Sequence, residues 1–205
     1  MNTSIFQAEY NDEDIRNLIF ENIAKMLFNR KMIPSDTEMT SQFIKNHDNN
    51  SSCYKKNNDD GHLKKVAVKL LFRKITTINK IDDIDEFLDK YKDYYKIIYV
   101  KKITPKAYSQ FIAYNNTEVF MAGELLTNKI DHISVPKHIL LTPEQQEQIK
   151  KEYGFKRNEI GKIKHNDPIA KYYNLQVGEI IMIERASITS GISIYYRICV
   201  PSPFI

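Results

Sequence analysis

The chain has 205 residues, of which 42% are hydrophobic and 27% are charged, as is ordinary for a globular protein of one large domain or two small ones. The formal net charge is +4, and division at residue 128 gives 19 basic and 18 acidic residues before it, against 11 and 8 after it. A protein that binds nucleic acid alone usually has a stronger, clustered basic signal. The charge therefore supports only weak or shared contact with DNA.

The two cysteines, Cys53 and Cys199, are far apart in the sequence. This argues against a disulfide framework or a structural zinc site and fits a reducing compartment. The first residues lack the basic and apolar regions of a signal peptide. The longest apolar runs, such as Ile180 to Ile183, are far below the ~18 residues that a membrane span needs. We expect a soluble, intracellular protein with no membrane partner.

Two helices are expected near the start of the chain. Apolar residues recur at helical spacing over residues 12–31, and acidic residues fill the first turn, where the helix dipole favours them. Ser35 and Glu38 form a capping box for a second, short helix. Its apolar residues are Met39, Phe43 and Ile44.

A polar loop and a strand–helix–strand unit follow. Residues 47–62 have almost no apolar content, which predicts a solvated loop. Residues 64–72 alternate between apolar and polar side chains, as in a strand with one buried face. A helix over 82–95 and a buried strand over 97–100 complete a plausible βαβ unit.

Thr104 is expected to cap a further helix that has Pro105 at its first position, where no backbone hydrogen bond is lost. The core-facing residues of this helix are Tyr108, Phe111 and Ile112. Short strands are predicted at 118–121 and 125–126. We therefore expect residues 1–128 to form an N-terminal domain with a small mixed sheet packed by helices.

Residues 129–205 are expected to form a second, compact domain of about four strands and two helices, so the fold class is α+β with two domains. A capping box of Thr142 and Gln145, with Pro143 between them, starts one helix. The other predicted elements are a strand over 131–135, the end of the first helix at Gly154, a helix from Asp167-Pro168 to Tyr173, and strands over 179–185 and 193–200.

Five short motifs follow one another between Glu118 and Val200. The first two are Glu124-Leu125-Leu126 with Asn128, and His132-Ile133-Ser134-Val135-Pro136-Lys137-His138. The other three are Ile160 to Ile163 followed by Asp167-Pro168-Ile169-Ala170-Lys171-Tyr172, then Gly178 to Arg185, then Ser187, Thr189, Gly191, Tyr196 and Arg197. In this order and spacing they resemble the fifth common subunit of eukaryotic-type DNA-directed RNA polymerases, whose C-terminal half alone makes up the archaeal relative.

The resemblance implies a non-catalytic polymerase subunit without a cofactor. Residues 129–205 would be the assembly domain that docks on the largest polymerase subunit, with other polymerase subunits as further partners. Residues 1–128 would form the lower jaw near downstream double-stranded DNA. The implied interface residues are His132, Val135, Pro136, His138, Asp167, Pro168, Arg185, Ser187, Thr189, Gly191, Tyr196 and Arg197.

The sequence departs from the family pattern at four positions. Ala186 stands where the family usually has proline, and Ser190 stands where it has alanine. Ile192 replaces an arginine, which removes one expected polar contact with the largest subunit. Lys106 replaces a small residue in the jaw.

His132 and His138 flank Val135-Pro136 and have three interpretations. A metal site needs further ligands, and no cysteine or carboxylate pair stands nearby, so no metal is predicted. The plain interpretation is histidines that hydrogen-bond to the backbone at a strand end. The resemblance adds a role in the subunit interface. Asp167-Pro168 is likewise first a helix start, and the two glycines, Gly178 and Gly191, first permit positive φ in turns.

Thr104-Pro105-Lys106 is locally a capped helix start. Such a start presents free backbone N–H groups and a positive dipole end, which suits a phosphate. Lys106 adds charge, and Lys101 and Lys102 stand just upstream. Taken with the resemblance, these residues are candidates for a DNA-proximal site that is blind to base sequence.

Two alternatives remain at the level of sequence. A nuclease-type enzyme would need paired metal-binding acids with lysine two residues after an Asp or Glu, and no Asp or Glu here has that neighbour. A free-standing DNA-binding regulator is opposed by the modest charge. The bias of 29 Ile against 11 Leu, with 17 Asn, suggests a large cytoplasmic DNA virus that encodes its own polymerase, and hence host cytoplasm and virion. A divergent cellular eukaryote, with a nuclear protein, is the other source.

Overall fold

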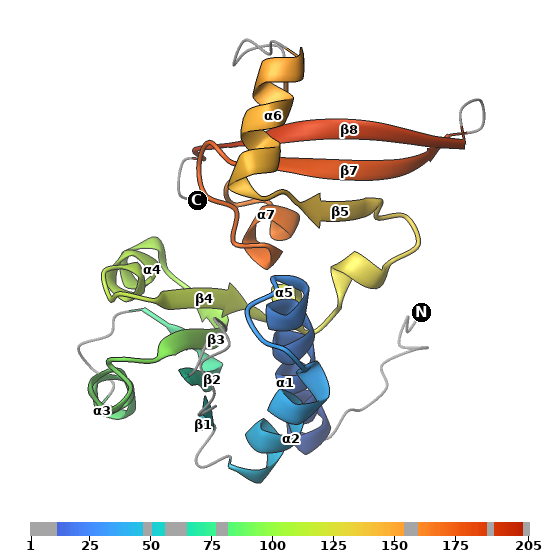
Figure 1. Cartoon of the computed structure of the whole chain (residues 1–205). Helices are drawn as coiled ribbons and strands as arrows, with labels where there is room; N and C mark the ends of the chain where they lie inside the picture. The colour runs from blue at the N-terminus through green and yellow to red at the C-terminus, as the bar shows by residue number, and fades with distance from the viewer. Residues whose placement is uncertain are drawn as a thin grey trace, which may run out of the picture. The chain divides into compact units, whose positions relative to one another are not determined.

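The computed structural model describes residues 12–46, 51–55, 65–76, 82–153, 160–187 and 191–202. The chain divides into two compact units, Met1–Thr127 and Asn128–Ile205, here named the N-terminal unit and the C-terminal unit (Figure 1). Each unit holds one four-stranded sheet with helices packed on it. The predicted α+β fold class is confirmed.

The sheet of the N-terminal unit has the strand order β1-β2-β3-β4. Its strands are β1 (Ser51–Lys55), β2 (Lys65–Ile75), β3 (Tyr95–Ile103) and β4 (Thr117–Met121). β1 is antiparallel to β2, whereas β2, β3 and β4 are mutually parallel. Helix α3 (Asp82–Lys90) connects β2 to β3, and α4 (Pro105–Ile112) connects β3 to β4. The expected βαβ unit is thus confirmed and is followed by a second one.

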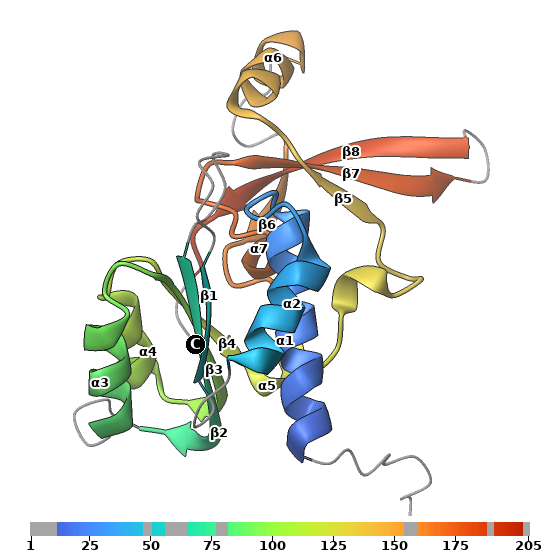
Figure 2. The ribbon, with the colours of Figure 1, turned by 60° about the horizontal axis from the view of Figure 1, so that its bottom comes forward.

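Helices cover both faces of this sheet. α3 and α4 pack on one face through a shared apolar cluster that includes Phe87 and Phe111. α1 (Asp12–Asn29) and α2 (Asp36–Lys45) lie on the other side (Figures 1 and 2). One of the two bonds of the predicted capping box of α2 is present: the Ser35 hydroxyl accepts a hydrogen bond from the Glu38 backbone N–H.

The prediction of a loop over 47–62 is wrong at residues 51–55, which form β1; the rest of that range lies outside the described residues. β1 pairs with β2 along its whole length. Tyr54 is fully buried, and the Ser52 hydroxyl donates to the Phe43 carbonyl at 2.8 Å. The strand was missed because the prediction used the average composition of residues 47–62, which is polar. Tyr54 is the only aromatic residue of β1 and changes that average little.

The prediction of one buried face for the second strand is also wrong. Both faces of β2 are buried from Val66 to Leu71 because helices lie on both sides. Even Lys69 is buried, with its ammonium 6.0 Å from the centroid of the Phe87 ring. The aliphatic part of the Lys69 side chain fills apolar space. The alternation of lysine with apolar residues along β2 therefore did not predict which side chains are exposed.

Three local predictions fail for identifiable reasons. α3 ends at Lys90 rather than near Tyr95, since the buried Lys96 ammonium donates to the carbonyls of the turn that follows. Residues Ala122–Leu125 form the short helix α5 rather than a strand, because the Glu124 carboxylate accepts the Met121 N–H at 2.7 Å. Ile112, which was expected to face the core, is exposed.

The C-terminal unit has the strand order β5-β7-β8-β6. Its strands are β5 (Lys137–Leu140), β6 (Gly161–Lys164), β7 (Ile180–Ser187) and β8 (Gly191–Val200), and its helices are α6 (Pro143–Tyr153) and α7 (Pro168–Tyr172). β7 and β8 form an antiparallel hairpin at the centre. Ile181 and Cys199 bury one face against α7, while Ile180 and Ile198 bury the other. The count of four strands and two helices is confirmed.

Both predicted caps in this unit form. The Thr142 hydroxyl accepts from the Gln145 N–H at 3.3 Å, and the Gln145 side chain accepts from the Thr142 N–H at 2.9 Å. Asp167 caps α7, with Pro168 at the first position. The expected end of the first helix at Gly154 lies outside the described residues.

The predicted strand over 131–135 is wrong. Lys129–Asp131 form a turn of 3₁₀ helix. The Val135 N–H then bonds the His132 carbonyl at 2.8 Å, so the chain turns again. Extended pairing starts only after Pro136, with Lys137 opposite Glu184.

One ion pair ties α1 to the sheet of the N-terminal unit. The Arg30 guanidinium donates to both carboxylate oxygens of Glu118, at 2.7 and 2.9 Å, and to the Tyr95 hydroxyl at 3.1 Å. The Arg30 side chain is 2% exposed. Removal of one member of such a pair leaves a buried charge without its counter-ion.

We therefore expect Glu118→Ala to lower the free energy of unfolding by about 3 kcal/mol, measured by urea denaturation. The matched control is Lys25→Ala, which breaks the exposed pair of Lys25 with Glu21 on the same helix and should cost no more than about 0.5 kcal/mol. Equal losses in the two variants would contradict a structural role for the buried pair.

Candidate functional site

The most exposed apolar surface of the C-terminal unit, among the described residues, lies at the far end of the β7–β8 hairpin. β5 pairs with β7 only from Ile181 to Glu184, and β6 pairs with β8 only from Arg197 to Val200. The hairpin therefore continues beyond both neighbouring strands, up to the pair of Ser187 with Gly191. Figure 1 shows this extension.

Apolar side chains follow the hairpin into this extension. Residues 198, 196, 194 and 192 share one face of β8 because side chains alternate along a strand. Ile198 is buried, whereas Ile194 is 53% and Ile192 66% exposed. Tyr195, on the other face, is 52% exposed. The apolar alternation that builds the core of the sheet thus continues into solvent-exposed positions of β8. Exposed apolar surface of this kind is typical of a site that binds another protein.

The segment before β5 carries a fourth exposed apolar side chain of this unit. Lys137 starts β5 opposite Glu184, with which it forms an ion pair at 3.1 Å. The preceding residues include Ile133, which is 98% exposed. His132 is exposed too, and its Nδ1 accepts a hydrogen bond from the Ser134 N–H at 3.2 Å. We name Ile133, Ile192, Ile194 and Tyr195 the hairpin patch.

The predicted interface residues fall into two groups. Ser187, Gly191, Tyr196 and Arg185 belong to the hairpin, and His132, Val135 and Pro136 lie in the segment before β5. The second group consists of His138, Asp167 and Pro168, together with Arg197, which is on hairpin strand β8 but whose charge acts on His138. Thr189 lies outside the described residues. Gly191 has φ of 72°, as a turn glycine requires.

The second group is organised around His138. Its Nδ1 lies 2.6 Å from the Pro136 carbonyl oxygen, and the Tyr173 hydroxyl donates to the His138 carbonyl at 3.2 Å. Burial lowers the pKa of His138; the Pro136 carbonyl raises it and the Arg197 charge lowers it. Burial also raises the pKa of Tyr173 to about 12. These groups anchor β5 to α7, so His138 has a positioning role in the fold.

Asp167 has a local role as well. Its carboxylate accepts the Ile169 N–H at 2.9 Å, and its own N–H donates to the Lys164 carbonyl. The plain interpretation of Asp167-Pro168 as a helix start therefore agrees with the structure.

None of the four hairpin-patch residues was among the predicted interface residues, although Ile133 lies within one of the motifs and Ile192 was noted as a departure from the family pattern. The sequence nevertheless contained a pattern that could have predicted this exposed surface. One face of β8 carries Ile192, Ile194 and Tyr196 without a polar interruption, and the other carries Tyr195 next to Ser193, whereas a strand face that meets only water is expected to be polar.

In the N-terminal unit, Thr104, Pro105 and Lys106 start α4 at the end of β3. The Thr104 hydroxyl accepts the Ala107 N–H at 3.4 Å and donates to the Thr76 carbonyl at 2.8 Å. Pro105 and Lys106 are exposed. The sheet places further charge here, because Lys74 on β2 stands opposite Lys102 on β3. Exposed basic residues at this end of the sheet are Arg73, Lys74, Lys101, Lys102 and Lys106.

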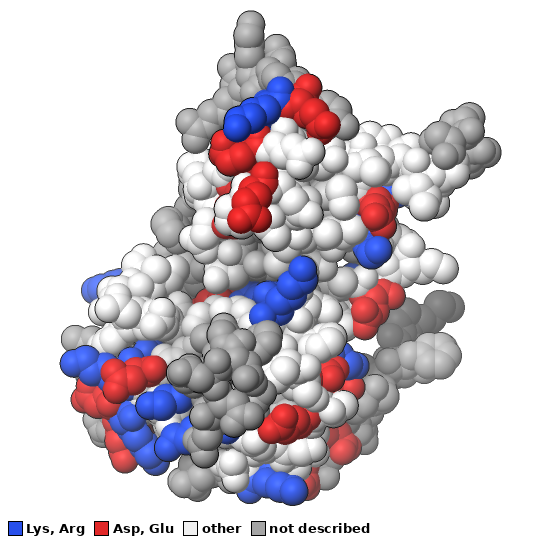
Figure 3. Space-filling model, viewed as in Figure 1, with Lys and Arg blue, Asp and Glu red and all other residues white. Residues whose placement is uncertain are grey.

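The surface of the N-terminal unit carries charges of both signs. Figure 3 shows basic and acidic side chains intermingled around α3, at the lower left of that view. The acidic residues of α3 whose side chains the structure describes are Asp83, Asp85, Glu86 and Asp89. Basic charge is therefore concentrated locally, at the ends of strands, rather than spread over a whole face.

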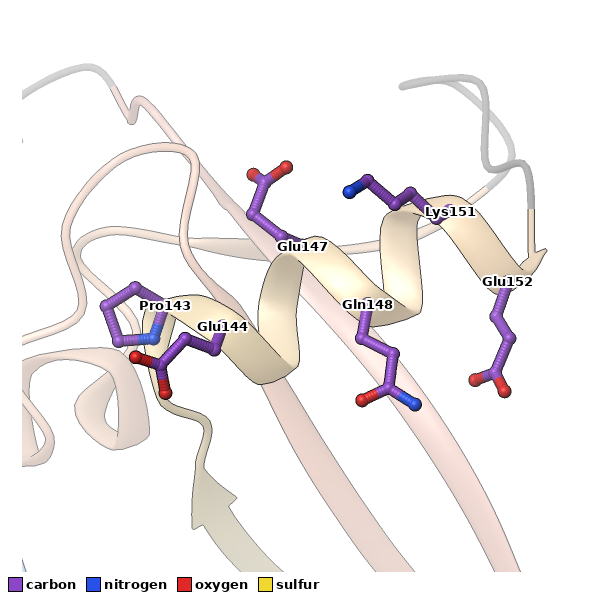
Figure 4. Close-up of a pocket in the computed structure, with 6 residues that line it drawn as sticks. All are labelled: Pro143, Glu144, Glu147, Gln148, Lys151 and Glu152. Atoms are coloured by element: carbon purple, nitrogen blue, oxygen red, sulfur yellow. The ribbon is translucent and has the colours of Figure 1, made fainter.

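Side chains that could ligate a metal are dispersed among the described residues. Across them, no three side chains of His, Cys, Asp or Glu come close enough together to hold a metal ion. A surface hollow lies along α6, lined by Glu144, Glu147, Gln148, Lys151 and their neighbours. Figure 4 shows that these side chains point away to different sides of one helix rather than toward a common point. Within the described ranges, every helix is too short or too polar to span a lipid bilayer.

Comparison with known proteins agrees with the resemblance of the motifs. Residues 127–199 match the family model "RNA polymerase Rpb5, C-terminal domain". Over 205 residues the chain is 36% identical to DNA-directed RNA polymerase subunit 5 of Acanthamoeba polyphaga mimivirus, and the match covers 97% of this chain and 98% of that protein. The chain belongs to the RNA polymerase subunit 5 family.

Other members of the subunit 5 family match shorter parts of the chain. The subunit rpabc1 of RNA polymerases I, II and III of Dictyostelium discoideum is 37% identical over 131 residues, which are 62% of this chain and 66% of that protein. Subunit Rpo5 of Methanothrix thermoacetophila is 46% identical over 70 residues, which are 34% of this chain but 90% of that protein. The family model covers most of the C-terminal unit.

The buried environment of His138 has a consequence for pH dependence. A histidine whose pKa is lowered by folding contributes stability that is complete above its unfolded pKa of about 6.5 and is lost as the pH falls toward the folded value. We expect the free energy of unfolding to fall between about pH 7.5 and pH 5 by less in His138→Gln than in the unmodified chain. Urea denaturation across that range measures the difference. Identical losses would show that His138 is not protected from protonation by the fold.

Proposed function

We propose that this chain is a non-catalytic subunit of a multisubunit DNA-dependent RNA polymerase. In this proposal the C-terminal unit is the assembly domain and docks on the largest polymerase subunit, with other polymerase subunits as further partners. The N-terminal unit forms the lower jaw near downstream double-stranded DNA. The role of the chain is to hold partners in place rather than to react.

The hairpin patch carries the docking part of the proposal. Its four side chains are large, apolar and half or more exposed, and exposed apolar surface of this kind is typical of an interface core. The motif residues of the hairpin and of the segment before β5 surround it. Ile192, where the family usually has arginine, gives this contact more apolar character.

The basic end of the N-terminal sheet supports the jaw part. Two lysines, Lys74 and Lys102, stand directly opposite each other, and like charges so placed destabilise a sheet unless an anion is near. The start of α4 directs backbone N–H groups to the same end. A duplex backbone fits such a surface, and the contact would carry no base specificity.

The absence of a catalytic role is supported by the residues of β2. A nuclease built on this type of sheet would need carboxylates there to hold a metal, and β2 contains neither Asp nor Glu. For localisation we propose host cytoplasm and virion, in line with the viral origin of the full-length relative.

The docking proposal predicts that Ile192→Asp/Ile194→Asp will weaken co-purification of the largest polymerase subunit with the full chain by at least about 10-fold, because charge replaces the apolar contact. Quantitative mass spectrometry of the purified complex measures the yield. The matched control is Val177→Asp, a residue of the same unit that is 50% exposed outside the hairpin. An unchanged yield for the double variant, or an equal loss for the control, would contradict the proposal.

The jaw proposal predicts that Lys106→Glu will weaken the grip of the assembled polymerase on downstream DNA without unfolding the chain. Loss of one phosphate contact should reduce the slope of log K against log salt by about 0.9, measured as dissociation of stalled elongation complexes at rising salt. Lys151→Glu, on the exposed side of α6, is the control of equal charge change. A slope that does not move in Lys106→Glu removes Lys106 from the DNA site.

A further inference from the structure

A second group of lysines lies at the opposite end of the N-terminal sheet from Lys106. Lys55 ends β1 and stands directly opposite Lys65, which begins β2. Both ammonium groups lie over the ring of Tyr94, at 5.9 and 5.6 Å from its centroid. Cation–π attraction holds them there, but it leaves two like charges side by side.

An aromatic column fixes this group to the core. The Tyr94 ring meets Tyr91 edge to face at 5.0 Å, and Tyr91 contacts the buried Phe87 at 4.9 Å between centroids. Lys90 adds a third ammonium, 5.5 Å from the Tyr91 centroid. We name Lys55, Lys65, Lys90, Tyr91 and Tyr94 the lysine–tyrosine cluster. It is a rigid arrangement at the ends of β1, β2 and α3 rather than three independent surface side chains.

The charge of the cluster is not neutralised by the described part of the chain. Its three lysines are exposed, and no carboxylate there lies within 4.0 Å of their ammonium groups. Among the described residues, the exposed acids nearest to Lys90 in sequence are Asp89 and Asp93. The Tyr94 hydroxyl raises the pKa of Lys55, so this group stays charged at neutral pH. Such a cluster is suited to binding an anion.

The composition of the cluster favours nucleic acid over protein. Lysine is depleted in protein interfaces, which need an apolar or aromatic anchor at their centre. None of the large hydrophobic residues exposed in the described ranges belongs to the cluster. Tyr91 and Tyr94 are half-buried and have lysines over them, so they do not offer open faces on which the bases of a single strand stack. Phosphates of a duplex remain as the best match.

We propose that the lysine–tyrosine cluster is a second contact with the backbone of double-stranded DNA. Lys65 and Lys74 begin and nearly end the same strand, β2. Nine residues of strand at ~3.3 Å each separate the two basic ends by roughly 30 Å, close to the ~34 Å of one turn of B-form DNA. A duplex can thus meet both ends about one turn apart. The identity of this duplex as downstream DNA rests on the proposed function.

The test uses the free full chain and a random-sequence DNA duplex of about three helical turns, with affinity measured by fluorescence anisotropy at rising salt. Lys55→Gln/Lys65→Gln should lower the slope of log K against log salt by about 1.8, for two lost phosphate contacts. Lys55→Arg/Lys65→Arg should keep the slope, since charge is retained. The matched control is Lys150→Gln/Lys151→Gln on α6, which changes the net charge equally and should leave the slope unchanged.

The inference would be overturned by no measurable duplex binding at low salt, by a slope in the Lys55/Lys65 variant equal to that of the control, or by tighter binding of a single strand of the same length. If poly-glutamate competes for the chain as well as unlabelled duplex does, the proposed ligand is an acidic polypeptide and not DNA, which also overturns the inference. Thermal unfolding of each variant shows whether the fold is kept. Because no other polymerase chain is present, these outcomes are independent of whether the chain co-purifies with a polymerase.

Discussion

The β7–β8 pairing is the interaction on which the C-terminal unit depends. Eight residue pairs join the two strands, from Ile180–Ile198 to Ser187–Gly191, while the flanking strands cover only the inner half. The inner half is buried on both faces and builds the two apolar clusters of the unit. The outer half keeps the same apolar alternation without cover. One continuous ladder therefore both holds the unit together and presents the hairpin patch in a fixed geometry.

Sequence patterns predicted what local rules determine. The capped starts at Ser35, Thr104, Thr142 and Asp167, the βαβ order and the β7–β8 hairpin follow from side chains close in sequence, and all are present. Two of the failures came from long-range contacts: β1 depends on Tyr54 entering the core, and the burial of Lys69 depends on helices from distant parts of the sequence. No window of the sequence contains those partners. The strand predicted at 131–135 failed for a local reason instead, because the Val135 N–H bonds the His132 carbonyl and turns the chain.

The candidate site shows the same division. The motifs located His132, Pro136, Ser187 and Gly191, which lie around the exposed end of the hairpin. They did not identify Ile194 or Tyr195, since exposure at those positions depends on how far β5 and β6 reach. His138 and Asp167 were placed among the interface candidates by resemblance, and their hydrogen bonds give them roles inside the unit. Likewise, the pairing of Lys55 with Lys65 needs the strand β1 that composition concealed.

The central claim is that the end of the β7–β8 hairpin is buried against another polymerase chain. Photo-cross-linking from position 194 in the intact purified enzyme tests it most directly, with the cross-linked chain identified by mass spectrometry. We predict an adduct with the largest subunit from position 194 and none from position 177. Adducts confined to this chain, or absent from position 194 while the enzyme is otherwise complete, would contradict it.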